Sequence, residues 1–299
     1  MRGLLGLLVA LVATAVTAAL FMNIVGQAGV AQPWGNELDD NFIFVRALPA
    51  ILATGVAYGL IGGWLYPRGA AARRGDGAVR RFSPATVLLH LLITIGFVIA
   101  LPTGLWQYMG GILDVQGPLP VFMYYRIHYI GAAIVLASVA AFVTYWWMTG
   151  DRSLVVAPRE WPRYLRGLAT EVHPMVRRWM VRLLRIDTAQ SAGSSGTFTF
   201  YEKTFMFPGW AVAITLITVT GLLKLLRYAI PIPGTVVFVV STLHVTAMVM
   251  LILLTLDHLR YYFARWPLVV AIFTGWLPPR RTAPRTAPSG APAATGGDE

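Results

Sequence analysis

Apolar residues are gathered into long blocks along this chain, separated by short polar stretches. The hydrocarbon core of a bilayer needs about 20 apolar residues of α-helix to cross it. A spanning segment must also satisfy its own backbone hydrogen bonds, so each block should be helical. Six blocks meet this length and predict an all-α integral membrane bundle with six transmembrane helices: Leu4–Gly26, Phe44–Tyr66, Pro84–Tyr108, Leu119–Met148, Phe207–Tyr228 and Thr235–Phe263.

The composition agrees with this interpretation and narrows the chemistry. Of 299 residues, 57% are hydrophobic and 12% are charged, which is typical of a membrane protein. There is no cysteine, so thiolate iron–sulfur clusters, c-type haem attachment and cysteine zinc sites are excluded from this subunit. The net charge of +11 comes from loop arginines without a basic stripe, so we expect contact with anionic lipid and no nucleic-acid partner.

The basic residues also predict the orientation. Most of the 24 lysines and arginines fall at the start of the chain, between the second and third spans, in the loop 149–203, or after the core of the last span. By the positive-inside rule these segments face the cytoplasm. The protein should therefore be a multi-pass membrane protein with its N-terminus and C-terminus cytoplasmic, and the family resemblance described below implies a bacterial-type plasma (inner) membrane.

Three regions are expected along the chain. Residues 1–79 hold two helices and a linker, although residues 1–25 also resemble a cleavable signal peptide. Residues 80–277 form a four-helix domain whose loop 149–203 contains an amphipathic helix at Trp161–Ile186 and a linker at Ala189–Gly196. Residues 278–299, rich in proline, alanine and glycine, form a disordered tail.

Four of the five histidines fall inside predicted spans, where an ionisable side chain indicates function. His244 and His258 share one face of the last span, about 21 Å apart along its axis. The topology places His128 at the outer depth of His244, and His90 at the inner depth of His258. Two pairs of imidazoles at two depths are expected of two six-coordinate b-type haems.

Other interpretations of these residues stay open. A lone membrane histidine can be a polar packing partner or a proton relay, and zinc or copper would need three or four ligands at one depth. Asp257 can form a hydrogen bond at the interface or orient an imidazole. His173, outside both pairs, is expected to be a surface residue, with a proton carrier at a quinone site as the alternative. A short sequence repeat is present, because Thr103-Gly104-Leu105 matches Thr220-Gly221-Leu222. The glycine in each can simply allow close packing of helices.

Haem propionates would need cations. Arg126, Lys224 and Arg227 are outer-face candidates, with interfacial snorkelling as the alternative. Arg80, Arg81 and Arg260 are their inner equivalents.

The region from Arg80 to Phe263 resembles the cytochrome b (gamma) subunit of respiratory formate dehydrogenases, within the bacterial cytochrome b561 and hydrogenase cytochrome b group. The resemblance rests on four short motifs: Arg126-Ile127-His128, Leu243-His244, His258-Leu259-Arg260-Tyr261 and Val219-Thr220-Gly221. It implies that His90 and His258 bind an inner haem b, and that His128 and His244 bind an outer one, which agrees with the pairing by depth.

The resemblance also implies a function. An extracytoplasmic molybdopterin-type catalytic subunit would pass electrons through an iron–sulfur subunit to the outer haem, then to the inner haem and to quinone. Tyr201, Glu202 and Lys203 stand where the family binds quinone, although they do not reproduce its Asn and Gln pattern. The alternatives are a stand-alone cytochrome b561-type quinone reductase, or a haem-free membrane anchor or transporter.

Overall fold

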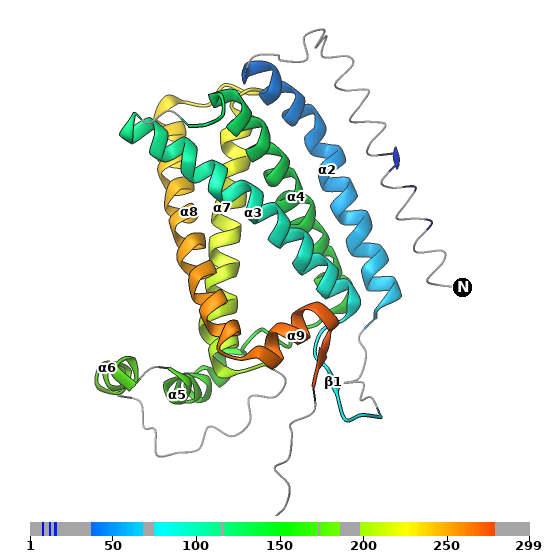
Figure 1. Ribbon diagram of the computed structural model, residues 1–299, viewed down its shortest axis with the longest axis vertical. Helices are drawn as coiled ribbons and strands as arrows, with labels where there is room; N and C mark the ends of the chain where they lie inside the picture. The colour runs from blue at the N-terminus through cyan, green and yellow to red at the C-terminus, as the bar shows by residue number, and fades with distance from the viewer. Residues whose placement is uncertain are drawn as a thin grey trace, which may run out of the picture.

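The computed structural model describes residues 37–67, 75–114, 117–172, 174–185 and 198–278, with four single positions nearer the start. Within these residues the protein is an all-α membrane helical bundle (Figure 1). Five of its helices are long and apolar enough to cross a bilayer. They are α2 (Glu37–Leu65), α3 (Pro84–Leu113), α4 (Val121–Thr149), α7 (Phe207–Leu226) and α8 (Gly234–Phe263).

Five of the six predicted spans are therefore confirmed as long apolar helices. The helices extend beyond the apolar blocks where hydrogen bonding continues, so α2 begins at Glu37 instead of Phe44 and α3 ends at Leu113 instead of Tyr108. The first predicted span, Leu4–Gly26, lies outside the described residues apart from single positions. The count of six spans stays a prediction.

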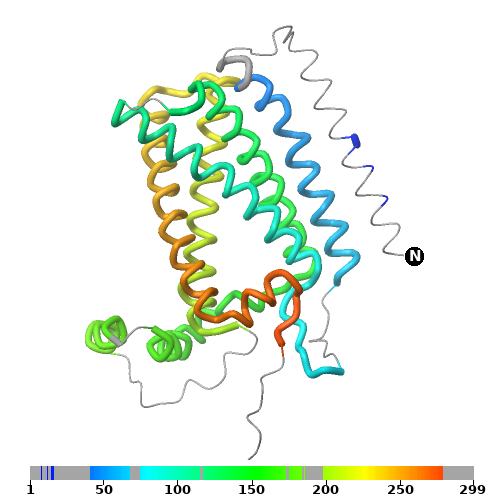
Figure 2. Tube along the Cα trace, viewed as in Figure 1, coloured from blue at the N-terminus to red at the C-terminus, as the bar shows by residue number. Residues whose placement is uncertain are grey.

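The long helices alternate in direction, so α3 with α4 and α7 with α8 form two antiparallel hairpins (Figure 2). The surface helices α5 (Trp161–Glu171), α6 (Pro174–Leu184) and α9 (Trp266–Thr274) lie at the end where α3 and α7 begin. We call this the basic end, because Arg80, Arg81, Arg260 and Arg265 belong to it. The other end, where each hairpin turns, is the opposite end.

Glycines bring neighbouring helices into backbone contact. On α2, Gly55, Gly59 and Gly63 are spaced four apart and face α4, where a Cβ at Gly59 would lie 2.5 Å from the Ala141 carbonyl oxygen. In the first hairpin, a Cβ at Gly131 would lie 2.7 Å from the Ala100 nitrogen of α3. Membrane helices associate through such close packing because lipid offers no hydrophobic driving force between them.

Packing within the hairpins is much denser than packing between them. α4 contacts both α2 and α3 along much of its length, and α7 contacts α8 in the same way. In contrast, α3 meets α8 at only a few residues, and α2 meets α7 at few. The region between the two hairpins is where the membrane histidines of α3, α4 and α8 lie.

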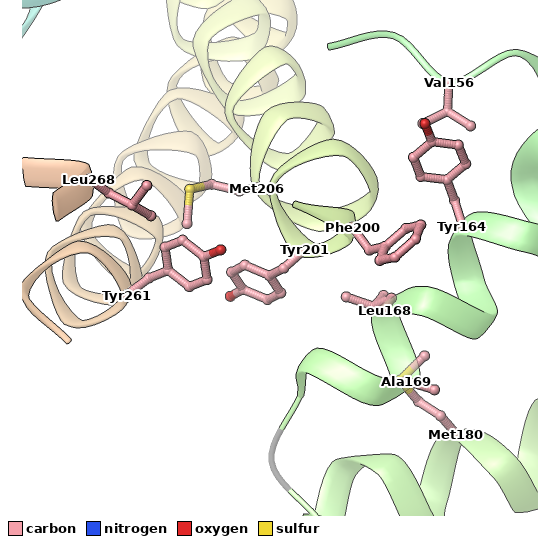
Figure 3. Packing of buried hydrophobic residues seen from close by; sticks show 10 residues of the cluster. All are labelled: Val156, Tyr164, Leu168, Ala169, Met180, Phe200, Tyr201, Met206, Tyr261 and Leu268. Carbon is pink, nitrogen blue, oxygen red and sulfur yellow. The ribbon is translucent and has the colours of Figure 1, made fainter. Parts of the chain in front are cut away.

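The loop at the basic end corrects one prediction. The single amphipathic helix expected at Trp161–Ile186 is two helices, α5 and α6, which are interrupted before Pro174. Proline disfavours helical geometry in the residue before it and suits the first turn of a new helix. Aromatic and aliphatic side chains of α5 pack against the start of α7 and the end of α8, through Tyr164, Leu168, Phe200 and Tyr261 (Figure 3).

Short elements complete the basic end. Strand β1 (Val79–Arg80) pairs with β2 (Trp276–Leu277), which ties the segment before α3 to the segment after α9. The boundary expected at residue 80 falls inside β1. The predicted linker Ala189–Gly196 and the tail beyond Pro278 lie outside the described residues.

A 3₁₀ turn, η1 (Pro158–Glu160), precedes α5, and a π-helical turn, η2 (Glu202–Met206), leads into α7. Pro208 has no N–H to donate to a carbonyl of the preceding turn, so regular α-helical bonding is interrupted where η2 lies. Single π turns of this kind often occur at functional sites.

Candidate functional site

His90 of α3 and His258 of α8 face each other from different hairpins. Their ring centroids are 6.1 Å apart, and the ring planes differ by 27°. A metal ion held between two imidazoles needs bonds of about 2 Å on each side, which puts the ligating nitrogens about 4 Å apart. Two rings with this separation are therefore close enough to share one metal ion.

Aromatic rings and unpaired polar atoms surround this inner pair. The Tyr262 ring lies 4.5 Å from the His258 ring and the Trp210 ring 5.9 Å from it. Among the described residues, the buried His90 Nδ1, His258 Nδ1 and Trp210 Nε1 atoms have no hydrogen-bond partner. Buried polar atoms are normally paired, so three unpaired ones in this group of residues leave hydrogen-bonding capacity that a further group could use.

The outer pair is His128 of α4 and His244 of α8. Their rings are close enough for a charge on one to repel a charge on the other, and Lys224 of α7 acts on both. His128 Nδ1 lies 3.3 Å from Thr103 Oγ1, and His244 Nδ1 lies 2.9 Å from Thr220 Oγ1. Each imidazole thus has a threonine of its own hairpin beside it.

These residues fit two six-coordinate haems. Each pair takes one histidine from each hairpin, and α8 contributes to both pairs. Because the two hairpins pack sparsely on each other, apolar helix faces line the region between them. A haem macrocycle in a helical bundle needs such apolar surroundings. Within the described part of the chain, no three His, Cys, Asp or Glu residues converge as a multidentate metal site would need.

The propionate candidates are placed differently from one another. Lys224 is half-buried and near both outer histidines, which makes it the best placed of the three. The Arg126 guanidinium lies 5.3 Å from the Phe122 ring centroid, and the exposed Arg227 lies over Tyr228 and donates to its hydroxyl at 2.5 Å.

The inner propionate candidates contact other side chains of the protein. Arg80 stacks on Trp276, and Arg260 pairs with Asp257 at 2.6 Å. Arg81 is buried and forms an ion pair with Glu202.

A cavity of about 500 Å³ opens at the basic end between α5, α6, the start of α7 and the end of α8. Its lining is mostly apolar and includes Tyr201 and Phe205, with the cations Arg260 and Arg265 and the carboxylate Glu171. The Tyr201 hydroxyl donates to Asp257. Burial, together with this hydrogen bond, raises the pKa of Tyr201, so its hydroxyl keeps its proton.

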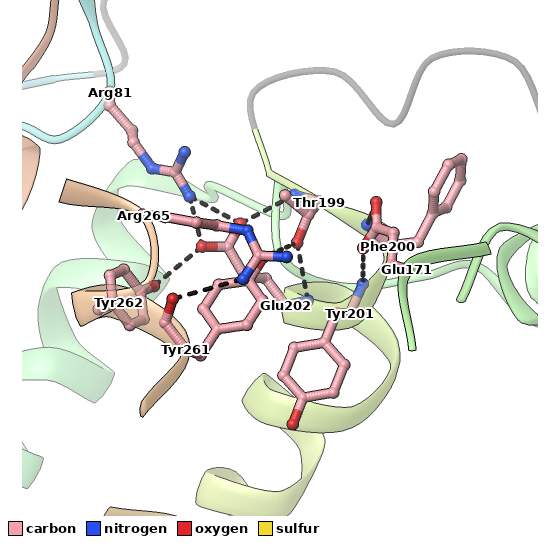
Figure 4. Close-up of polar contacts among 9 residues, drawn as sticks. All are labelled: Arg81, Glu171, Thr199, Phe200, Tyr201, Glu202, Tyr261, Tyr262 and Arg265. Atoms are coloured by element: carbon pink, nitrogen blue, oxygen red, sulfur yellow. Dashed lines mark hydrogen bonds and ion pairs between the residues drawn. The ribbon is translucent and has the colours of Figure 1, made fainter. Parts of the chain in front are cut away.

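Glu202, predicted to contact quinone, does not line this cavity. It is 3% exposed, and its carboxylate accepts from Arg81 Nη2 at 2.5 and 2.6 Å and from Tyr262 Oη at 2.9 Å (Figure 4). The backbone N–H of Thr199 donates to it as well, at 2.8 Å. With these partners the carboxylate holds the start of α7 against β1 and α8.

Lys203 also lies off the cavity, and donates to the Tyr164 hydroxyl at 3.2 Å. Asp257 forms the interfacial hydrogen bonds predicted for it, with Tyr201 and Arg260, whereas among the described residues it forms no hydrogen bond to an imidazole. His173 lies outside the described residues.

Sequence reasoning missed several residues around the histidines. Trp210 and the pairing of Arg81 with Glu202 were missed because these contacts join segments far apart in the chain. Tyr262 was missed although it lies one helical turn after His258, a spacing that could have indicated it. The repeated Thr-Gly pair did indicate the outer site, since Thr103 and Thr220 are the residues that contact the outer imidazoles.

No model of a known protein family, no curated protein and no solved structure matches this chain. The resemblance to the cytochrome b group therefore stays a prediction from the motifs, and the function is argued from the site.

Proposed function

We propose that this protein is a membrane cytochrome b subunit, which carries electrons from an extracytoplasmic oxidoreductase of the formate dehydrogenase type through two b haems to quinone. The observation that carries the proposal is the placement of the two α8 histidines. His258 faces His90 at a ring separation of 6.1 Å, and His244 interacts electrostatically with His128 at the other level of the bundle.

When bound, each haem would supply a one-electron redox centre, with potential tuned by its imidazole ligands and surroundings. The chain's own residues would hold and insulate these groups. His90 and His258 would bind the inner haem, and His128 and His244 the outer one. Lys224 would balance charge beside the outer pair, and the apolar faces of both hairpins would exclude water.

The cavity at the basic end supports a quinone site. Its apolar walls suit a quinone ring with an isoprenoid tail, and Tyr201 offers a hydroxyl that stays protonated. Asp257, which accepts the hydrogen bond of that hydroxyl, would hold the hydroxyl in place at the cavity. We therefore propose Tyr201, with Arg260 at the cavity wall, as the quinone contacts, and assign Glu202 and Lys203 to the support of the helices around them.

Charge supports the orientation. The basic end would face the cytoplasm by the positive-inside rule. The opposite end, where the hairpins turn, would then face the iron–sulfur subunit and the molybdopterin-type catalytic subunit. A stand-alone cytochrome b561-type quinone reductase would use the same cavity and histidines but no such partners, so co-purification of those subunits separates the two proposals.

The proposal is tested by the visible spectrum and haem content of the purified full chain, made with ample haem supply. We expect two b haems per chain. We expect His244→Ala to remove the outer haem and keep the inner one, and His90→Ala to do the reverse, because the pairs share no histidine. A colourless chain would leave a membrane anchor or transporter, and equal loss of both haems from a folded variant would contradict the pairing.

A further inference from the structure

The two hairpins hold their outer histidines in the same way. In the first hairpin, Thr103 of α3 contacts His128 of α4, and in the second, Thr220 of α7 contacts His244 of α8. The spacing from threonine to histidine is 25 residues in one hairpin and 24 in the other. Two hairpins that do not pack closely on each other thus carry one shared arrangement.

The direction of each hydrogen bond follows from the threonine. Thr103 Oγ1 donates to the Ile99 carbonyl at 2.7 Å, and Thr220 Oγ1 donates to the Leu216 carbonyl at 2.6 Å. A hydroxyl has a single proton, so once it is committed to a carbonyl the oxygen can only accept from the imidazole. The imidazole Nδ1 atom must therefore be the donor.

Backbone carbonyl acceptors independently indicate that Nδ1 of each outer imidazole is the donor. His128 Nδ1 lies 3.0 Å from the carbonyl oxygen of Ala100, and His244 has a backbone hydrogen bond to Ile217. Ala100 and Ile217 each precede the contacting threonine by three residues. A carbonyl accepts but never donates, so both imidazoles carry their proton on Nδ1 and keep the lone pair of Nε2 free.

A glycine follows each threonine and makes room for the ring. A Cβ at Gly104 would lie 3.0 Å from His128 Cε1, and one at Gly221 would lie 3.3 Å from His244 Cε1. Both distances are tighter than ordinary contact, so a side chain there would push the imidazole away from its threonine. The Thr-Gly pair therefore supplies both the acceptor and the space.

The inner pair lacks this arrangement. Within the described residues, Nδ1 of His90 and Nδ1 of His258 have no hydrogen-bond partner, although both atoms are buried. Thr94, one turn after His90, bonds only to the His90 backbone carbonyl, at 2.7 Å. The two levels of the bundle are thus built differently around the same residue type.

We propose that Thr103 and Thr220 are positioning residues, which fix the outer imidazoles in the Nδ1–H form and present both Nε2 atoms to one metal centre. The inference rests on the proposed function and adds a difference between the two sites. An acceptor on Nδ1–H makes the imidazole more basic and a stronger ligand, and loss of such partners typically lowers metal affinity about 10- to 100-fold.

The test uses the full chain in lipid nanodiscs, with the variants Thr103→Val/Thr220→Val and Thr103→Ser/Thr220→Ser. Valine keeps the shape and removes the hydroxyl acceptor but leaves the backbone carbonyl of Ala100 or Ile217, whereas serine keeps both acceptors. Because one acceptor remains, we expect the valine pair to retain the outer haem about 10-fold less tightly, the lower end of the usual range. A basic ligand favours the ferric state, so the outer midpoint potential should rise, by about 59 mV for each tenfold shift of that equilibrium. The inner haem and the serine pair should stay unchanged.

Thr246→Val is the matched control, because Thr246 lies on α8 near His244 and its hydroxyl bonds only to the Thr242 carbonyl in the described contacts. It should leave both potentials unchanged. Equal shifts of both haems in the valine pair, or no shift of the outer one, would overturn the inference.

A second measurement does not depend on haem. Nitrogen-15 NMR of histidine-labelled full chain, assigned with His128→Gln and His244→Gln, reports which ring nitrogen carries the proton. We expect Nδ1–H at both outer positions. Protonation on Nε2 would overturn the inference even if two haems bind, whereas a haem-free chain with Nδ1–H imidazoles would contradict only the proposed function.

Discussion

At the residue scale, burial and partners separate side chains that look alike in the sequence. Tyr201, Glu202 and Lys203 are consecutive and polar, but they project in different directions at the start of α7. Tyr201 lines the cavity, Glu202 is enclosed by Arg81 and Tyr262, and Lys203 reaches Tyr164. One of the three is therefore placed for ligand contact and two for structure.

Glu202→Ala should destabilise the protein strongly. Removing one partner of a buried ion pair leaves an uncompensated charge, here on Arg81, and typically costs about 3–5 kcal/mol. Arg260→Ala is the control, since Arg260 is exposed and its pair with Asp257 should be worth about 0–1 kcal/mol. Thermal unfolding in detergent measures both, and equal losses would contradict the structural role of Glu202.

Tyr201→Phe should lower the rate of quinone reduction by about 100-fold, because a positioned proton donor typically accelerates a reaction by about 100-fold or more. The raised pKa of Tyr201 means that the wild-type rate should not fall from ionisation of this hydroxyl as pH approaches 10. Steady-state assays with a soluble quinone across pH give both results. Lys203→Met should retain the wild-type rate, because Lys203 does not line the cavity. A loss of rate in Lys203→Met but not in Tyr201→Phe would contradict a quinone site at Tyr201.

At the scale of elements, close packing decides how the helices are arranged. The structure packs α2 along α4 through Gly55, Gly59 and Gly63. The glycine spacing is visible in the sequence. The face that it serves is not, because the helix is apolar on all sides and lipid and protein neighbours look alike to such a pattern.

Gly59→Leu should separate α2 from α4. A side chain at this position meets the Ala141 carbonyl and the Thr144 Cβ, and overpacking of this kind costs about 1–3 kcal/mol. The measurement is thermal unfolding together with the haem content of the full chain. At Gly111 of α3 an added Cβ has nothing within 4 Å, so Gly111→Leu should change neither; a similar loss in both variants would exclude a specific α2–α4 contact.

At the scale of the whole molecule, charge and topology together predict which end faces the cytoplasm. The surface helices, the strand pair and the buried Arg81–Glu202 pair all lie at the basic end. Because the chain has no cysteine, single introduced thiols can report the side of the membrane without background.

Gly75→Cys and Gly234→Cys form a matched pair, since an added side chain meets nothing within 4 Å at either site. Gly75 precedes β1 at the basic end, and Gly234 begins α8 at the opposite end. We expect a membrane-impermeant thiol reagent to label Gly234→Cys in spheroplasts and to label Gly75→Cys only after lysis. The opposite pattern would reverse the orientation of the protein.

The sequence by itself determined the membrane class, the five spans that the structure describes, and the pairing of His90 with His258. These properties depend on hydrophobic block length and on position along a helix, which are local. The tertiary structure alone decided that α5 and α6 are separate, that Glu202 pairs with Arg81 across 121 residues, and that Thr103 and Thr220 reach His128 and His244. Helices that are apolar all round show no preferred face, so only their packing against one another sets which side chains meet.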